Sequence, residues 1–320
     1  ITGFSGISPL GHGWATVSQA LQTGRSGIQF IPEWEKIEGL NTRLAGRAPY
    51  VRPAHFNRKV TRTMGRIAMM AVHVTEESLE MAGLRQHPIL GSGQTGVAYG
   101  SCAGSSDATV EFFELLHFGR TNGINATTYL RMMAHTAAVN IGVYFGLKGR
   151  TYTTNTACTS SSQALGYAYE AIKNGVQTVM VAGGAEELCP SQATVFDTLF
   201  ATSTKNDTPT LTPAPFDSQR DGLVIGEGAC TFVLEDYAHA EARGATIWAE
   251  VVGFGTNADG THVTQPNHET MGVAMELALR SAQLPASAIG YINAHGTATD
   301  RGDIAESHAT ARVIGTQTPI

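Results

Sequence analysis

Hydrophobic residues along the chain follow two patterns, helical spacing and short apolar runs. Apolar side chains recur every three or four positions in several segments, which predicts amphipathic helices. These segments are residues 11–22, 61–82, 108–117, 129–145, 160–173, 270–282 and 303–313. Short apolar or β-branched runs predict strands over residues 95–99, 151–156, 177–183, 223–234, 248–253 and 289–294. Because apolar strands alternate with helices, the sequence predicts α/β layers with mostly parallel sheets.

A faint internal repeat indicates two related halves. Residues 1–6 with the helix that follows resemble residues 252–256 with theirs, and residues 96–104 resemble residues 290–298 in the same way. The third unit of the first half, residues 152–173, has a counterpart that would begin just after Ile320. The pattern therefore predicts that the second half is truncated.

The composition is that of a globular chain with a large core. Hydrophobic residues make up 42% of the 320 residues and charged residues only 15%, and the net charge of -6 argues against a nucleic-acid-binding protein. No apolar run approaches the ~20 residues of a membrane span, and the N-terminus lacks the pattern of a signal peptide. The four cysteines match neither a zinc site nor a disulfide framework, so we expect free thiols, no metal and a cytoplasmic protein.

Residues 156–161, with the sequence TACTSS, place a cysteine where a strand ends and a helix begins. At a helix N-terminus the unsatisfied N–H groups and the helix dipole favour the thiolate form of Cys158, which is a good acyl acceptor. The alternative is a structural role, because many buried cysteines are inert small hydrophobes.

Two further segments carry candidate chemistry. Residues 293–306, NAHGTATDRGDIAE, deliver His295 from a predicted strand into a loop rich in glycine and threonine, at the sheet edge where α/β proteins place their sites. A loop histidine bonded to backbone is the alternative. Residues 215–229, PFDSQRDGLVIGEGA, lack the order of a dinucleotide-binding motif, and alone they indicate a structural turn with an Asp–Arg pair.

Together with VAGGAEE at residues 181–187, these segments occur in the order and spacing of a known family. The chain resembles the elongating β-ketoacyl-acyl-carrier-protein synthases, type I and type II condensing enzymes of fatty acid and polyketide synthesis. The resemblance covers essentially the whole chain. It implies an α/β thiolase-like fold with two related βαβαβ halves in an α-β-α-β-α layering, residues 1–245 forming the first half and 246–320 the start of an incomplete second.

The resemblance also assigns roles to individual positions. Cys158 matches the nucleophile and His295 the first histidine of a Cys-His-His site, and Glu306 matches a buried supporting acid near Asp303. The residues that would lie beside the substrate or its phosphopantetheine arm are Thr297, Thr299, Thr264, His262, Phe196 and Ala103. The family's supporting lysine, second histidine and Gly-Phe-Gly loop belong to a later stretch that is absent from this sequence. We therefore expect the chain to be a fragment that does not catalyse the full reaction.

The implied reaction needs no metal or redox cofactor, because the phosphopantetheine arrives on the acyl carrier protein. An acyl group would move to Cys158, and decarboxylation of malonyl-carrier protein would give an enolate that attacks the Cys158 thioester. Ala103 is small where long-chain enzymes often carry isoleucine, which indicates a roomier or differently shaped acyl pocket. Arg58, Lys59, Arg62 and Arg66 form a basic stretch that is either a dock for the acidic carrier protein or an ordinary solvated face.

Three other enzyme classes fit the sequence less well, and one alternative is a protein without catalytic activity. A degradative thiolase lacks the His-Gly-Thr-x-Thr element, an initiating synthase would show Cys-His-Asn, and no Gly-x-Ser-x-Gly elbow indicates a serine hydrolase. A non-catalytic chain-length factor or truncated partner subunit is the alternative outside catalysis, although such proteins typically replace the nucleophile. The family resemblance implies a homodimer, or a heterodimer with a related subunit of the same fold.

Overall fold

The computed structural model of the chain describes residues 1–262 and 264–320, and it divides into two compact units. The first unit comprises Ile1–Ser26, Arg47–Leu188 and Gly226–Glu250. The second unit comprises Gly27–Gly46, Cys189–Ile225 and Val251–Ile320. Every helix in the described part of the chain is too short or too polar to cross a lipid bilayer.

The first unit is built on a six-stranded sheet with the strand order β2-β1-β8-β7-β5-β6. Its strands are β1 (Gly3–Ser8), β2 (Gly11–His12), β5 (Thr95–Gly100), β6 (Thr151–Thr154), β7 (Val179–Glu186) and β8 (Gly228–Glu235). β5 runs parallel to β6 and β7, whereas β8 runs antiparallel to both β7 and β1. The sheet is therefore mixed: β1, β5, β6 and β7 share one direction, as predicted, whereas β8 and the short β2 run against it. β8 runs antiparallel because the chain re-enters the sheet with Gly228 opposite Glu186, at the end where β7 stops.

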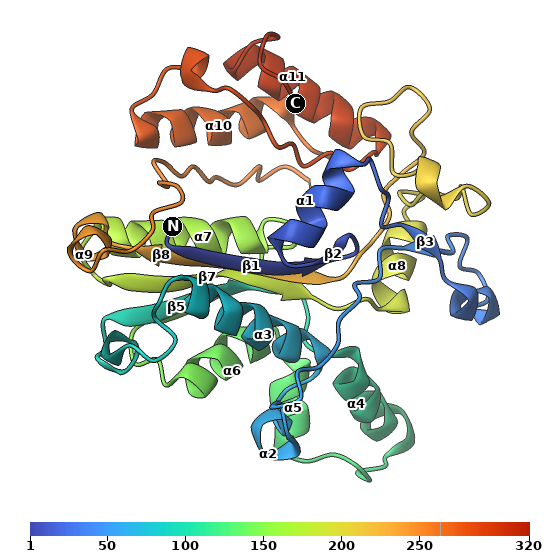
Figure 1. Ribbon diagram of the computed structural model, residues 1–320. Coiled ribbons are helices and arrows are strands. Elements are labelled where there is room, and N and C mark those ends of the chain that lie inside the picture. Colours follow the sequence, from blue (N-terminus) through green and yellow to red (C-terminus); the bar gives the residue numbers. More distant parts are fainter. Residues whose placement is uncertain (263) are drawn as a thin grey trace. The chain divides into compact units, whose positions relative to one another are not determined.

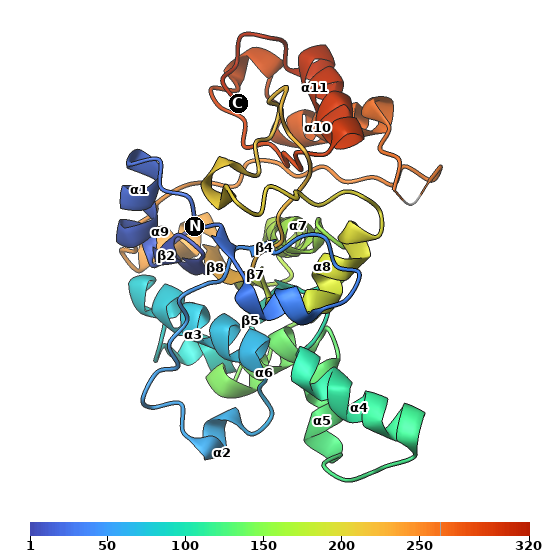
Figure 2. The same ribbon diagram turned by 90° about the vertical axis from the view of Figure 1, so that its right-hand side faces the viewer.

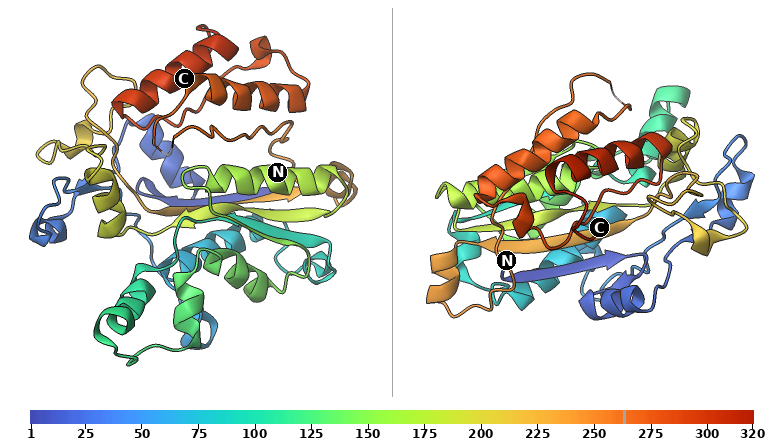
Figure 3. Two further views of the ribbon diagram at one scale, coloured as in Figure 1. Left: turned by 180° about the vertical axis from the view of Figure 1, so that it is seen from behind. Right: turned by 90° about the horizontal axis from the view of Figure 1, so that it is seen from above.

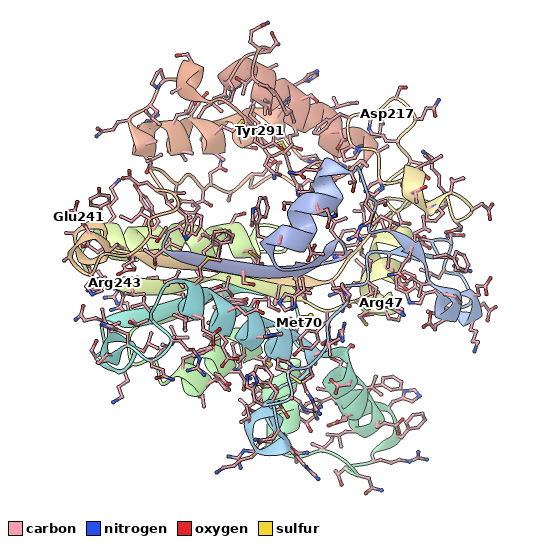
Figure 4. The ribbon with its side chains drawn as sticks, in the orientation of Figure 1. Arg47, Met70, Asp217, Glu241, Arg243 and Tyr291 are labelled. Carbon is pink, nitrogen blue, oxygen red and sulfur yellow. The ribbon has the colours of Figure 1, made fainter. Side chains whose placement is uncertain are left out.

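Helices cover both faces of this sheet, as Figure 1 shows. α7 (Ser160–Lys173) packs on β5 and β7 from one face, and α3 (Arg66–Met81) and α6 (Thr136–Phe145) pack on the other (Figures 1 and 3). Because both of its faces are covered, every residue of β5 is buried, as its apolar composition predicts. Met70 of α3, labelled in Figure 4, is fully buried in this core.

The other α-helices of the first unit lie around this core. They are α1 (Trp14–Gln22), α2 (Arg58–Thr61), α4 (Ser106–Phe118), α5 (Ala126–Met132) and α9 (Tyr237–Ala242). α4 and α5 lie side by side (Figures 1 and 2), and Arg131 joins them through ion pairs with Asp107 and Glu111. Arg243, beyond the end of α9 (Figure 4), donates to both carboxylate oxygens of Glu235 at 2.6 and 2.7 Å.

The second unit contains few strands. Its strands and α-helices are β3 (Gln29–Phe30), β4 (Leu44–Ala45), α8 (Pro190–Asp197), α10 (His268–Ala282) and α11 (Asp300–Val313). β3 pairs with β4 in antiparallel fashion, and α10 packs against α11. Long loops connect these elements, and one of them carries Asp217, which Figure 4 labels.

The structure corrects several predicted elements. Residues 248–253 and 289–294 form no strand, because single hydrogen bonds such as Trp248 N–H to Ile1 O (2.9 Å) and Ile292 N–H to Pro319 O (2.9 Å) replace a ladder. The predicted helix over residues 129–145 is two helices, α5 and α6, because Met133 adopts an extended conformation. The predicted helix over residues 61–82 begins only at Arg66, after an extended Gly65. The strand predicted over residues 223–234 begins only at Gly228, as β8.

Candidate active site

Cys158 lies in the tight turn between β6 and α7, with its side chain exposed. Ala157, directly before it, has a φ of 53°, which is the left-handed region that non-glycine residues rarely adopt. Such backbone strain is common at functional sites, where the surroundings hold the chain in a specific geometry. Thr159 occupies the N-cap position of α7 and Ser160 is the first residue of the helix, so the thiol stands at the helix N-terminus, as predicted from the sequence.

Hydrogen bonds from neighbouring side chains hold this turn. Ser160 Oγ donates to the carbonyl of Ala157 at 2.6 Å and accepts the N–H of Thr156 at 2.9 Å. Thr154 at the end of β6 donates its hydroxyl to the carbonyl of Ser160 at 2.8 Å. Ser160 of TACTSS and Thr154 just before this segment therefore fix the backbone on both sides of the thiol.

Two glycines let the sheet approach the start of α7. A Cβ on Gly100, the last residue of β5, would lie 2.5 Å from the carbonyl carbon of Ser160 and 2.6 Å from the nitrogen of Ser161. A Cβ on Gly184 of β7 would overlap Ser161 Oγ. Because real side chains essentially never come so close, glycine is required at both positions to seat the helix N-terminus and the nucleophile turn.

Cys158 faces a cavity of about 430 Å³ in the first unit. The ends of β5, β7 and β8 and the turn before α7 line it, together with two other cysteines, Cys102 and Cys230. Burial, assisted by the charge of Glu186, raises the pKa of the Cys102 thiol, and burial raises the pKa of Cys230 to about 11. Both therefore stay protonated at neutral pH, which makes them poor nucleophiles beside Cys158.

Glu186, at the end of β7, holds the loop that follows β5. Its Oε2 accepts the N–H of Cys102 at 2.7 Å, and the carbonyl of Cys102 accepts from Asn155 Nδ2 at 3.2 Å. Burial raises the pKa of Glu186, although the hydrogen bonds from Cys102 and Ala103 oppose the change. Ala103, predicted to line the acyl pocket, is exposed in the same loop.

Glu187 and Glu227 are buried carboxylates to which the sequence analysis gave no role. Glu187 accepts from both the hydroxyl and the N–H of Ser106 at 2.7 Å, and from the Ser105 hydroxyl at 2.9 Å. Glu227 takes a bidentate pair from Arg66 at 2.7 and 2.9 Å and also accepts the N–H groups of Ala48 and Leu188. A buried acid is stable only when paired in this way. Acidic residues within the glycine-rich segments 181–187 and 215–229 could have indicated these anchors.

The pairing of Arg66 separates it from the rest of the predicted basic stretch. Arg58 and Lys59 of α2 and Arg62 after it are exposed, and no ion pair between described residues includes them. Arg66 instead lies in the first turn of α3, and its guanidinium is committed to the side chain of Glu227. We therefore assign Arg66 to the structure of the unit and keep only the other three cations as candidates for docking.

Replacing Glu227 with glutamine is expected to lower the free energy of unfolding by about 2 kcal/mol at pH 7, because Arg66 loses its charged partner. Burial alone would raise the pKa of Glu227, but the hydrogen bonds from Arg66 and the backbone outweigh it, so the pKa lies below 4.5. The contribution of Glu227 is therefore present above pH 4.5 and is lost as the pH falls through the lowered pKa. Urea unfolding from pH 7 to pH 3 measures this.

The matched control is Glu114→Gln, because Glu114 is a partly exposed acid of α4 whose ion pair with Arg120 spans 3.7 Å. We expect that variant to stay within about 0.5 kcal/mol of wild type at every pH. Equal stability losses for the two variants at pH 7, or an undiminished difference between Glu227→Gln and wild type at pH 3, would contradict the role of Glu227.

In the second unit, His295 begins the loop that leads into α11. Glu306 of α11 accepts the backbone N–H of His295 at 2.7 Å and that of Gly296 at 2.9 Å, so the carboxylate positions this loop directly. Glu306 is half-buried, whereas the fully buried acid of the segment is Asp303. The expectation that the acid at position 306 is buried is therefore wrong, because Glu306 is only half-buried.

Asp303 joins two motifs that are far apart in the sequence. One of its oxygens accepts the N–H of Ala298 at 3.0 Å, and the other accepts the N–H of Phe216 at 2.6 Å. Arg220 approaches that second oxygen at 3.5 Å and also pairs with Asp300. The Asp–Arg pair that the sequence indicated within residues 215–229 is thus formed with the 293–306 segment instead.

The two threonines of the loop lie together. The hydroxyls of Thr297 and Thr299 are 2.8 Å apart, and Thr299 caps α11 by accepting the N–H of Gly302 at 3.3 Å. A Cβ on Gly302 would come within 2.5 Å of Thr299 Oγ1, so the glycine makes room for the pair. The motif therefore brings His295 and both threonines into one hydrogen-bonded loop.

The remaining predicted residues of the second unit lie outside this loop. His262 and Thr264 are exposed and contact each other, with Thr264 N–H donating to His262 Nδ1 at 3.1 Å. Phe196 is half-buried on α8. Its neighbour Asp197 is a buried anchor that the sequence analysis missed, and it accepts bonds from Asn41, Thr42 and Thr202.

The family to which the chain belongs follows from comparison with known proteins. The model of the β-ketoacyl synthase N-terminal domain matches residues 1–240, and that of the β-ketoacyl synthase C-terminal domain matches residues 248–320. The chain belongs to the β-ketoacyl synthase family. Members of this family are condensing enzymes of the acyltransferase type with the thiolase-like fold, so the predicted family, fold class and enzyme class are confirmed.

Similar β-ketoacyl synthases include curated and solved proteins. The chain is 35% identical over 321 residues to the 3-oxoacyl-[acyl-carrier-protein] synthase 1 of Haemophilus influenzae, covering 100% of this chain and 78% of that protein. A crystal structure of a β-ketoacyl synthase from Burkholderia phymatum has a TM-score of 0.97 and 53% identity, covering 98% of this chain and 78% of that one. The ishigamide ketosynthase/chain length factor has a TM-score of 0.88 and 31% identity, with coverages of 100% and 78%.

Proposed function

We propose that this protein is a 3-oxoacyl-[acyl-carrier-protein] synthase that holds its acyl group on Cys158. The observation that carries the proposal is the exposed thiol in a strained turn at the N-terminus of α7, facing a cavity of about 430 Å³. The experiment is an assay of the purified protein with acyl-carrier protein and malonyl-carrier protein. A 3-oxoacyl product two carbons longer than the acyl donor, with release of CO2, supports the proposal, and its absence contradicts it.

The first half-reaction is a thioester exchange at Cys158. The thiolate attacks the carbonyl carbon of the acyl thioester, and the carrier's pantetheine sulfur leaves and takes up a proton. Backbone N–H groups around the turn would stabilise the tetrahedral oxyanion, and each such donor is worth about 3–4 kcal/mol in other enzymes. The N-terminus of α7 favours the anionic sulfur before attack and after the condensation.

The second half-reaction forms the new carbon–carbon bond. The bond between the malonyl carboxylate and the α-carbon breaks, CO2 leaves, and the electron pair remains as a thioester enolate. The His295 imidazole donates a hydrogen bond to the enolate oxygen, and Glu306 holds the backbone from which that imidazole projects. The enolate carbon then attacks the Cys158 thioester, and the Cys158 sulfur leaves as thiolate.

The acyl donor and the malonyl extender unit both arrive on an acyl carrier protein. This partner is part of the name of the Haemophilus influenzae relative. Arg58, Lys59 and Arg62 form an exposed cationic surface suited to such an acidic partner. Replacing all three cations with glutamate is expected to raise KM for acyl-carrier protein about tenfold while leaving kcat unchanged. The reason is that association with the acidic carrier protein is weakened, whereas the chemical steps at Cys158 are unaffected.

The control for this triple variant reverses the exposed cations Lys148, Lys173 and Arg280, which changes the net charge equally at other places. KM for a small acyl donor such as acyl-CoA should stay at the wild-type value in both variants. Equal rises of KM for acyl-carrier protein in the two triple variants would show that only net charge matters, and would contradict docking on α2.

Ala103 is proposed to widen the acyl pocket. Replacing it with isoleucine adds three methyl-sized groups to the exposed loop beside Cys102, and we expect kcat/KM for long acyl donors to fall about tenfold relative to short ones. Competition between short and long acyl-carrier proteins in one reaction, followed by mass spectrometry, measures the ratio. An unchanged ratio would contradict the assignment of Ala103 to the pocket.

A non-catalytic partner subunit is the second candidate, favoured by the likeness to the ishigamide ketosynthase/chain length factor. Cys158 opposes it, because a subunit of that kind would need no nucleophile in a strained turn. We propose a dimer, formed either with a second copy or with a related subunit, in the cytoplasm and without a cofactor of its own. Native mass spectrometry of the protein purified from its source distinguishes the two assemblies.

A further inference from the structure

A cluster of three potential metal ligands lies in the first unit, apart from the nucleophile turn and its cavity. His12 of β2 and His73 and Glu77 of α3 place their ligand atoms within 4.8 Å of one another. His12 Nε2 lies 2.9 Å from Glu77 Oε2, and His73 Nε2 lies 3.5 Å from Glu77 Oε1. The cysteine spacing predicted no metal site, and the sequence analysis did not single out these three residues.

We propose that His12, His73 and Glu77 bind one divalent transition-metal ion of the zinc type. Zn²⁺ binds imidazole nitrogen and carboxylate oxygen at about 2.0–2.2 Å, which places two tetrahedral ligand atoms about 3.4 Å apart. Both Nε2–carboxylate distances in the cluster are close to that spacing, so small side-chain rotations suffice. Two imidazoles favour Zn²⁺, Cu²⁺ or Ni²⁺ over Mg²⁺ or Ca²⁺, which prefer all-oxygen sites.

The surroundings hold the three ligands in place. His73 and Glu77 are four residues apart on α3, so both side chains leave the same face of the helix. The Ser5 hydroxyl donates to Glu77 Oε2 at 2.6 Å and orients the carboxylate, as partners of metal ligands commonly do. The His73 ring packs against the ring of His12, with 4.9 Å between their centroids, and against Tyr50 and Phe56 at 6.0 Å.

The site also has access to solvent. The exposed fractions of the His12 and Glu77 side chains are 32% and 34%, so water can reach a fourth coordination position.

The bound ion would connect the β1–β2 hairpin to α3. His12 comes from the hairpin and the other two ligands come from the helix, which packs on β1. An ion that binds only the folded state raises its stability by mass action. The inference assigns a stabilising role to the metal and does not depend on the proposed condensation reaction.

The test adds Co²⁺ to the chelator-treated protein and records the absorption spectrum and stoichiometry, with competition by Zn²⁺. We expect one Co²⁺ per chain, a visible d–d band without the near-ultraviolet thiolate band of a cysteine site, and a higher melting temperature. His12→Asn should lower the affinity at least tenfold and abolish the rise in melting temperature. His12 is chosen because its side chain is partly exposed, whereas replacing the more buried His73 endangers folding.

The matched control is His55→Gln. His55 also contacts a glutamate of α3, with 2.7 Å between His55 Nε2 and Glu76 Oε2. That carboxylate already pairs with Arg85, and this group of three residues contains one histidine where the proposed metal site contains two. This variant should bind Co²⁺ like wild type. Wild-type binding by His12→Asn, equal losses in both variants, a spectrum of thiolate ligation, or no binding at all would overturn the proposal.

Discussion

Replacing His295 with alanine is expected to lower the rate of condensation by about 10²- to 10³-fold while acyl transfer to Cys158 proceeds near the wild-type rate. The enolate forms only in the second half-reaction, and His295 is proposed to donate a hydrogen bond to its oxygen. Thioester exchange at Cys158 relies on the thiol and on the backbone of its own turn. Single-turnover acyl loading and steady-state product formation measure the two steps separately.

The control for this variant is His268→Ala, which removes an exposed imidazole at the start of α10 in the same unit. We expect both half-reactions to keep wild-type rates in that protein. A parallel loss of acyl loading and condensation in His295→Ala would contradict a role confined to the enolate, and wild-type condensation would remove His295 from the mechanism.

Replacing Gly100 with alanine is expected to slow acyl loading about 100-fold and to lower the free energy of unfolding by about 2 kcal/mol. The added Cβ would lie 2.5–2.7 Å from backbone atoms of Ser160 and Ser161, which cannot rotate away as a flexible side chain would. Either β5 or the start of α7 must shift, and the turn that carries Cys158 shifts with it. Urea unfolding and the rate of adduct formation measure both effects.

Gly142→Ala is the matched control, because Gly142 lies within α6 and a Cβ there would meet nothing within 4 Å. Alanine in a helix interior should raise the free energy of unfolding by about 0.5–1 kcal/mol and leave acyl loading unchanged. If Gly100→Ala behaved like Gly142→Ala in both measurements, the close approach of β5 to α7 would matter neither for stability nor for acyl loading, which would contradict this prediction.

The elements that the sequence predicts well are those whose signals are local. The helix over residues 160–173 and the buried strand over residues 95–99 are confirmed, because helical spacing and an apolar run decide them without distant partners. Residues 248–253 and 289–294 have the same β-branched character but form no strand. A strand requires a hydrogen-bonding neighbour, and local propensity does not reveal one.

The direction of β8 could not be predicted for a related reason. Residues 189–225 leave the first unit, and the end at which the chain re-enters decides whether β8 runs parallel or antiparallel to β7. Nothing in the apolar pattern of the strand encodes that end. The mixed sheet therefore follows from the path of the chain and not from the character of its strands.

The residues of the candidate site also fall into two groups, those that a local motif predicts and those that depend on a distant partner. Cys158 at the start of a helix and Glu306 beside the His295 loop follow from motifs that are continuous in the sequence. The anchoring role of Glu227 depends on Arg66, which is 161 residues away, and that of Asp303 on Phe216, which is 87 residues away. Such pairs are decided by packing, so a single sequence reveals the acid but not its partner.

The most direct test of the central claim is the intact mass of the protein after incubation with acyl-carrier protein, followed by peptide mapping of the adduct. The account predicts one acyl group per chain, attached to Cys158, present in Cys102→Ala and absent in Cys158→Ala. An adduct that persists in Cys158→Ala, maps to another residue, or never forms on the wild-type protein would contradict the account.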